Sequence, residues 1–257
     1  SSDVCSSDLA YKNSDFKTAF LIFEELALKD DLKAQSKLGF MYLYAKGVDV
    51  DFNKALSFLE KASNKGDAEA QYYIGMMYWA GREFTKNYGQ ASIWFSKSAN
   101  QNYAPSYVML YRFYDIGYGV EKNKKVANEY KQKAIDLYQS AIKKGDTNAM
   151  IALGNLLEGV DAGTYYIKAA EKGSIEGQFK AGFWLARNDY KTDYTQALKW
   201  LNMAANSNHP EAYYQLARIY DEGVGVQRNR AKAIEFYRKA ADLGFVGITK
   251  EAAYKLK

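Results

Sequence analysis

The stretch Ala212–Gly244, AYYQLARIYDEGVGVQRNRAKAIEFYRKAADLG, decides the fold of this chain. Ala212, Leu216 and Tyr220 stand four residues apart, which places them on one face of a helix. The following GVG triplet allows the backbone to leave that helix with positive φ. A second helical pattern then runs to Gly244. One such helix pair cannot bury its apolar face alone, so the stretch predicts neighbours of the same shape.

Weaker copies of this stretch fill most of the chain. Residues that align with Ala212 follow one another at intervals of 36, 36, 43, 28 and 35 residues. The six anchors are Ala34, Ala70, Ser106, Ala149, Gly177 and Ala212. The motif is A-x-x-x-[LIA]-[GA]-x-x-[YL], followed by a turn and by [KQ]-A-x-x-[YWF]-[YFL]-x-[KM]-[AS]-[AS]-x-x-G, and the individual copies keep it in part. Repeats of this period are typical of a helical solenoid.

This motif resembles the Sel1-like repeat, a relative of the tetratricopeptide repeat. The turn G-x-G-V, present after Ile116 and after Glu222, is characteristic of that family. The resemblance covers nearly the whole chain. It implies an all-α fold, a right-handed α-α superhelix or solenoid of about six helix-turn-helix repeats. It also implies a bacterial scaffold or adaptor that binds a protein or an extended peptide.

Three repeats depart from the pattern. The third has about seven extra residues around 122–133, and this basic segment is either a solvated helix extension or a basic docking surface. The fourth is shortened, and we expect Gly159 and Gly163 to bracket a tight turn. The fifth loses its glycine turn at Asn188-Asp189.

The two ends of the chain differ from the repeats. Residues 1–9 lack helical periodicity and contain VCSSDL, a string that resembles a translated sequencing adapter, so we expect them to be non-native. Residues 10–30 read as the second helix of a truncated repeat, starting near Tyr11, and residues 31–257 as the array. Residues 249–257 are either a capping helix or the start of a seventh repeat. Cytoplasmic, periplasmic and secreted locations all stay open.

The residues that could carry catalysis are few. His209 is the only histidine and is expected to begin a helix, and the only cysteine, Cys5, lies in the excluded segment. Cys–His catalysis and Cys/His zinc sites therefore lack their residues. The G-x-G turns follow helices instead of strands, so they are not phosphate loops. We predict no enzyme activity, cofactor or metal.

Charge and hydropathy limit the kinds of partner that we expect the chain to bind. The net charge is +5, from 35 basic and 30 acidic residues, a balance too mild to predict nucleic-acid binding. No apolar run approaches the ~18 residues of a transmembrane helix. The partner expected is a protein or extended peptide of unknown identity, and the oligomeric state stays open. Two alternatives are a secreted or envelope-associated binder of host or cell-wall components, and the regulatory module of an enzyme encoded upstream.

The resemblance also implies a candidate surface, because first helices of tetratricopeptide repeats line a concave face that contacts ligands. Transferring that phase selects Phe40, Tyr44, Tyr72, Met76, Trp79, Arg112, Asn155, Phe179, Phe183, Tyr214 and Arg218. Arg112, Asn155 and Arg218 occupy equivalent positions and offer N–H donors for a peptide carboxylate. The alternative is that the apolar members pack between repeats. Five further aromatic residues fit the motif and are expected in the core: Trp94, Tyr165, Trp200, Phe236 and Tyr237.

Overall fold

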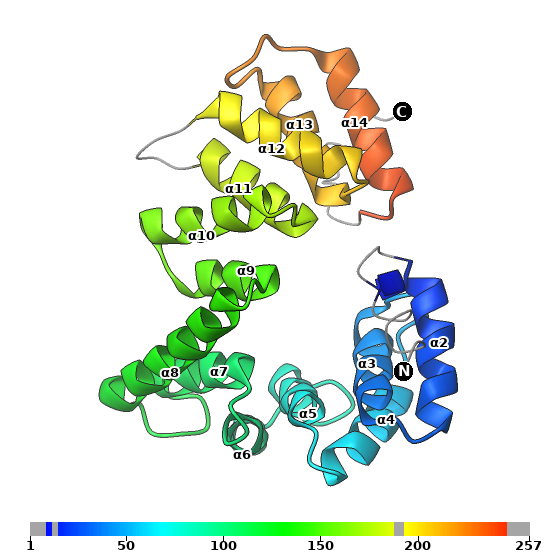
Figure 1. The fold of residues 1–257 in the computed structure, drawn as a ribbon, viewed down its shortest axis with the longest axis vertical. Helices are drawn as coiled ribbons and strands as arrows, with labels where there is room; N and C mark the ends of the chain where they lie inside the picture. The colour runs from blue at the N-terminus through cyan, green and yellow to red at the C-terminus, as the bar shows by residue number, and fades with distance from the viewer. Residues whose placement is uncertain (1–8, 12–14, 188–192, 246–257) are drawn as a thin grey trace. The chain divides into compact units, whose positions relative to one another are not determined.

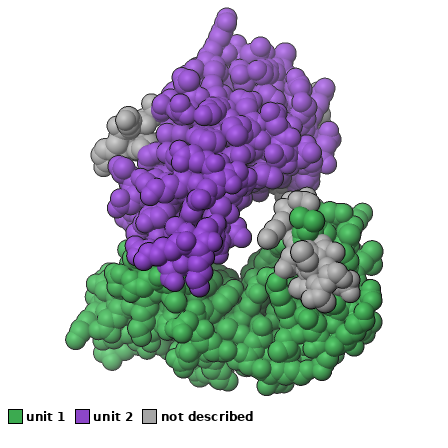
Figure 2. Space-filling model, viewed as in Figure 1, with its two compact units in different colours: residues 1–137 green, residues 138–257 purple. Residues whose placement is uncertain are grey.

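The computed structural model describes residues 9–11, 15–187 and 193–245. In these residues the chain is a succession of helix-turn-helix pairs, which confirms the predicted all-α repeat architecture (Figure 1). The chain divides into two compact units, residues 1–137 and 138–257 (Figure 2). We call them unit 1 and unit 2 and describe each by itself.

Unit 1 contains the first repeats. Its helices are α2 (Phe16–Leu28), α3 (Leu32–Tyr44), α4 (Phe52–Asn64), α5 (Ala68–Ala80), α6 (Tyr88–Ala99) and α7 (Ala104–Ile116), followed by most of α8 (Lys124–Lys143). Each helix from α2 to α6 packs against the next one, and the first helices α3 and α5 also contact each other.

Unit 2 contains the remaining repeats. Its helices are α9 (Thr147–Leu156), α10 (Gly159–Glu171), α11 (Ile175–Arg187), α12 (Tyr194–Asn206), α13 (Pro210–Glu222) and α14 (Arg230–Asp242). The first helices α9, α11 and α13 contact one another in sequence along one side of the unit.

Helix starts follow the capping residues. Asp67 caps α5, where its side chain accepts a hydrogen bond at 2.7 Å from the backbone N–H of Ala70. His209 does the same for α13, where Nδ1 accepts from the Ala212 N–H at 3.3 Å, so its predicted place at a helix start is confirmed. Asp15 caps α2, and for that reason this helix begins at Phe16 instead of near Tyr11.

A glycine on each of several first helices receives a large side chain from the second helix of the same repeat. A methyl group on Gly39 would lie 2.5 Å from Leu59, and one on Gly75 would lie 2.7 Å from Phe95. Both partners are fully buried. The position is the fifth after the repeat anchor, which is Gly or Ala in five of the six repeats and Tyr111 in the third. The two helices of a repeat can approach closely because this side chain is missing.

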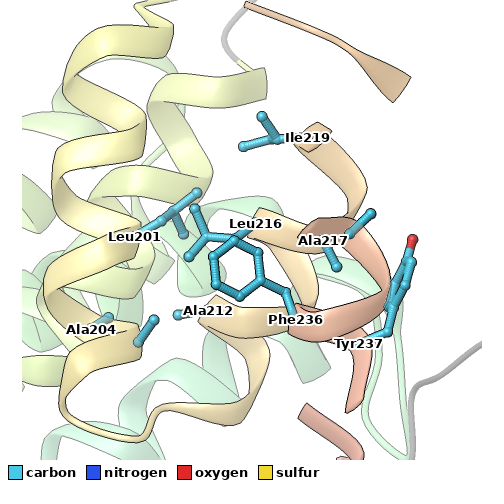
Figure 3. Close-up of a cluster of buried hydrophobic side chains, with 10 residues drawn as sticks. Leu201, Ala204, Ala212, Leu216, Ala217, Ile219, Phe236 and Tyr237 are labelled. Atoms are coloured by element: carbon cyan, nitrogen blue, oxygen red, sulfur yellow. The ribbon is translucent and has the colours of Figure 1, made fainter. Parts of the chain in front are cut away.

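The core of unit 2 shows how these side chains meet. Leu201, Leu216 and Phe236 point toward one another from α12, α13 and α14, and Ala204 and Ala212 close one end of the cluster (Figure 3). Burying each large side chain contributes on the order of 1.5–3 kcal/mol to folding.

Three of the five aromatic residues expected in the core are buried, which are Trp200, Phe236 and Tyr237. The prediction was wrong for Trp94 and Tyr165, which are half-buried. A lysine ammonium lies 4.2 Å from the Trp94 ring and another 5.4 Å from the Tyr165 ring. Trp94 packs at the edge of the unit 1 core, and in both residues a lysine of the next helical turn lies over the ring.

The irregular repeats are explained by helix length. Helix α8 has 20 residues where most second helices have 13, which confirms the helix extension in the third repeat. Helix α9 has only 10 residues. The turn expected between Gly159 and Gly163 was wrong, because α10 begins at Gly159 and Gly163 lies buried inside it. A side chain at Gly163 would overlap the Trp184 ring, so this glycine serves helix packing. The changes expected at 188–189, residues 1–8 and residues 249–257 lie outside the described residues.

The second glycine of the G-x-G turn makes a contact between repeats. Gly225 has φ +71°, and a side chain there would overlap the Tyr194 ring at the start of α12. Gly119 stands at the same repeat position, with φ +64°, against Tyr88 at the start of α6. The turn therefore needs glycine both for its backbone conformation and for the close approach.

We expect Gly225→Ala to destabilise unit 2 by more than the backbone strain alone. Strain at positive φ costs about 1 kcal/mol, and overlap with Tyr194 adds about 1–3 kcal/mol. Gly173→Ala is the matched control, because Gly173 has φ +83° but nothing within 4 Å of an added methyl group. Urea unfolding followed by circular dichroism compares the two. Equal losses in the two variants would show that the Tyr194 contact contributes nothing.

Candidate functional site

The predicted surface residues all lie on first helices, and none of the eleven is buried. Tyr44, Arg112 and Asn155 are exposed. The half-buried members are Phe40, Tyr72, Met76, Trp79, Phe179, Phe183, Tyr214 and Arg218. Six of the eleven belong to unit 1 and five to unit 2, so the structure groups them into two sets instead of one.

Residues two positions after the anchor serve packing. The Tyr72 ring lies 5.5 Å from the Tyr103 ring of the next repeat, and the Phe179 ring stacks at 4.6 Å on the imidazole of His209. Tyr214 likewise lies 5.8 Å from Tyr237. Phe40, at a different position, packs 5.3 Å from the buried Tyr73 ring. These side chains hold neighbouring elements together and offer only part of their surface to a ligand.

A second set of predicted residues lines a hollow in unit 1. Tyr44 comes from the end of α3, and Met76 and Trp79 come from the end of α5. The hollow has a volume of about 130 Å³. Its other lining residues are Leu43, Met77, Ala80 and Arg82. The lining is thus apolar or aromatic apart from one guanidinium and one phenol hydroxyl.

Arg82 gives this hollow its charge. Its guanidinium carbon lies 5.0 Å from the centroid of the Phe52 ring, which holds the side chain against the protein. Burial raises the pKa of the Tyr44 hydroxyl, and the positive charge of Arg82 acts in the opposite direction. An apolar hollow with a positive charge at its rim can hold an apolar side chain beside an anionic group.

Unit 2 has a hollow at the same place in the repeat. It has a volume of about 100 Å³ and lies where α11 and α13 meet. Its lining residues are Phe183, Ala186, Arg187, Tyr194, Leu201, Gln215, Arg218, Ile219, Glu222 and Val224. Arg187 stands ten residues after its anchor, as Tyr44 does in unit 1. Arg218 stands six residues after its anchor, as Met76 does. The two hollows are therefore equivalent positions of the repeat with different side chains.

The set of Arg112, Asn155 and Arg218 does not act as equivalent donors. Both Nε and Nη2 of Arg218 donate to Glu222 Oε1, at 3.2 and 2.9 Å. The Asn155 side-chain oxygen accepts a hydrogen bond at 2.9 Å from the Tyr166 hydroxyl. Only Arg112 is exposed without such a partner among the described contacts, and neither hollow includes it.

His209 is part of a polar link between repeats. Its Nε2 lies 3.1 Å from Glu176 Oε2, while Nδ1 accepts the capping bond from Ala212, so Nε2 carries the proton. Burial alone would raise the pKa of Glu176, but the hydrogen bond from His209 and the charge and hydrogen bond of Lys180 outweigh it and lower that pKa. This places His209 in helix capping and repeat packing.

The sequence did not point to Arg82 and Arg187. Both stand at or just beyond the last turn of a first helix, outside the positions that the motif specifies. Their distance from the anchor could have pointed to them. Residues ten to twelve positions after an anchor lie beside the groove between that first helix and the neighbouring first helix. The hydrogen bond of 2.6 Å from Ser36 to Asp67, which joins the first two repeats, was also missed.

Within the described ranges, no three His, Cys, Asp or Glu side chains gather closely enough to hold a metal ion. Among the same residues, no helix combines the length and the apolar character needed to cross a membrane.

Comparison with known proteins identifies the family of the repeats and their bounds. The family model for the Sel1 repeat matches residues 32–67, 68–103, 112–146, 148–174, 175–209 and 210–245. The solved structure of a Sel1 repeat protein from Oxalobacter formigenes is 26% identical, with a TM-score of 0.54, over 93% of this chain and 97% of that one. An immunity protein from Pseudomonas aeruginosa is 16% identical over 81% of each chain, with a TM-score of 0.54, and shows likeness of fold alone.

Similar curated proteins are much longer. Chitin synthase regulator SKT5 of Saccharomyces cerevisiae is 30% identical over 120 residues, which are 42% of this chain and 17% of that protein. DAP3-binding cell death enhancer 1 of Rattus norvegicus is 31% identical over 77 residues, which are 30% of this chain and 15% of that protein. The chain spans less than a fifth of the length of these relatives.

Tyr237, which lies beneath Tyr214, makes the stability of the folded chain depend on pH. Burial, followed by the nearby Asp221 carboxylate, raises the pKa of Tyr237 from 10.0 to about 12. The unfolded chain releases this proton near pH 10, whereas the folded chain keeps it until about pH 12. Stability should therefore fall as the pH rises through this window, by on the order of 1–3 kcal/mol. Tyr237→Phe should remove that loss in urea unfolding at pH 9, 10 and 11, and parallel pH profiles would contradict the expectation.

Proposed function

The chain belongs to the Sel1 repeat family, and from that premise we propose that it is a non-enzymatic scaffold that binds a protein or an extended peptide through its first helices. The hollow of unit 1 is the observation that carries this proposal. Tyr44, Met76 and Trp79, all expected on the ligand-contacting face, line it together.

The size of the hollow favours a side chain of a partner over a free small molecule. Sites for small ligands are typically about 300–1,000 Å³, whereas this one is about 130 Å³. One leucine-, methionine- or phenylalanine-sized group fills such a space. Binding energy at protein interfaces concentrates on anchors of this kind, seated in apolar hollows with aromatic walls.

The chemistry of the lining side chains supports ligand binding and not catalysis. In unit 1 they are Leu, Tyr, Met, Trp, Ala and Arg, a set without a carboxylate, thiol or imidazole. General acid–base catalysis needs a group whose proton moves near neutral pH. Met76 instead supplies flexible, polarisable surface that adapts to different apolar groups, and the buried Met77 lies beneath it.

A second candidate is regulation of an enzyme through direct binding. The observation that favours it is the likeness to SKT5, which is a chitin synthase regulator. Because the matched part is 17% of that protein, the likeness carries the binding repeats and not the enzyme that they would regulate.

The test uses a display library of random 12-residue peptides, selected against the whole chain. Peptides enriched by the wild-type chain should include a class that binds the Met76→Ala and Trp79→Ala variants at least tenfold more weakly, because each change removes a wall of the hollow. Fluorescence anisotropy of labelled synthetic peptides measures the affinities, and circular dichroism checks that each variant keeps its helices.

Ile93→Ala is the matched control. Ile93 is 47% exposed on α6, a second helix, and takes no part in the hollow. The proposal predicts unchanged affinity for this variant. A selection in which every peptide binds the Met76→Ala and Trp79→Ala variants as tightly as the wild type would contradict binding at the hollow of unit 1.

A further inference from the structure

We propose that the hollow of unit 2 binds an acidic side chain, Asp or Glu, beside an apolar residue in an extended segment of a partner protein. This inference rests on the proposed function, since it names the chemistry of the partner at one of the two hollows. It is carried by Arg187, an exposed arginine that lies over the Phe183 ring at the edge of an apolar floor.

Several lining positions carry different residues in the two hollows. Arg187 in unit 2 takes the place of Tyr44 in unit 1, and Arg218 takes the place of Met76. Ala186 stands in place of Leu43, Glu222 in place of Ala80, and Val224 in place of Arg82. Each hollow therefore has one positive charge that its own lining does not balance, from Arg82 in unit 1 and from Arg187 in unit 2.

Arg187 is the group available to a ligand. Its guanidinium carbon lies 5.1 Å from the centroid of the Phe183 ring, and its side chain is exposed. It forms no ion pair with the side chains of residues 9–11, 15–187 and 193–245. An arginine held on a ring face keeps its N–H edge free, and this edge matches the two oxygens of a carboxylate.

Arg218 is held in place by Glu222. Glu222 Oε1 accepts from Nε and Nη2, which leaves the Nη1 donors of Arg218 outside this ion pair. Glu222 balances the charge of Arg218, so the excess positive charge of the hollow comes from Arg187. A single acidic side chain would balance it.

The apolar floor of the hollow is the reason why we expect an apolar residue beside the acidic one. Leu201 and Ile219 lie beneath it and are buried in the core cluster of unit 2 (Figure 3). With about 100 Å³ available, one apolar side chain fills the space while a neighbouring carboxylate reaches Arg187.

The charge of the whole unit points the same way. Residues 138–257 contain 17 Lys or Arg and 13 Asp or Glu, whereas residues 1–137 contain 18 and 17. Unit 2 therefore carries most of the net charge of +5. A positive field raises the encounter rate of an acidic segment and favours it over a basic one.

The test repeats the peptide selection with a charge reversal. The library is selected in parallel against the wild-type chain, the Arg187→Glu variant and the Arg238→Glu variant. Arg238 is exposed on α14, so its reversal makes the same charge change in unit 2 away from the hollow. Wild-type and Arg238→Glu selections should enrich Asp or Glu beside an apolar residue. Arg187→Glu should enrich Lys or Arg at that position.

Synthetic peptides then measure the effect without a charge reversal. A selected peptide and its Glu→Gln counterpart should differ about tenfold in affinity for the wild-type chain. They should bind equally to Arg187→Gln, a variant that keeps the size of an exposed side chain. Equal binding of the two peptides to the wild-type chain would overturn the inference.

The two proposals fail in different ways. Peptides that need Phe183, shown by weaker binding to Phe183→Ala, but have no acidic preference would overturn only the inference about Arg187. Peptides that are insensitive to Phe183→Ala and to Met76→Ala would overturn the proposed function as well.

Discussion

The fold depends on one contact that recurs through the chain, the large side chain of a second helix seated where the first helix has no side chain. Leu59 fills the space beside Gly39, Phe95 that beside Gly75, and Leu201 that beside Gly182. A methyl group at any of these glycines would enter the neighbouring side chain. Because interiors are packed as densely as crystals, the helix pair has one arrangement that satisfies the contact. That arrangement fixes which side of each first helix faces away from its partner.

The candidate surface follows from this geometry. With the glycine face turned inward, positions two residues after the anchor meet the next repeat, and positions six to ten after it line the groove between first helices. The hollows of unit 1 and unit 2 occupy the same place in the repeat for this reason. Their chemistry differs because the motif leaves these positions unspecified. Binding residues can therefore vary from repeat to repeat while the packing stays unchanged.

Features of the fold that depend on local, repeated sequence patterns could be predicted from the sequence. The anchors, the cap at His209 and the longer α8 could all be predicted, since each depends on spacing or on one residue type. Gly163 was misread because a glycine that ends a helix and one that packs against Trp184 look alike in sequence. Arg82, Arg187 and the Ser36–Asp67 hydrogen bond were missed because they depend on how neighbouring helices are offset.

The central claim is that a partner's side chain enters the hollow of unit 1. Methionine methyl NMR tests it most directly, because two of the six methionines, Met76 and Met77, line that hollow, whereas Met203 is exposed on α12. The chain, labelled with ¹³C in its methionine methyl groups, is titrated with a selected peptide. The account predicts that the Met76 and Met77 resonances shift with peptide concentration while that of Met203 does not. Tight binding that leaves Met76 and Met77 unchanged would contradict it.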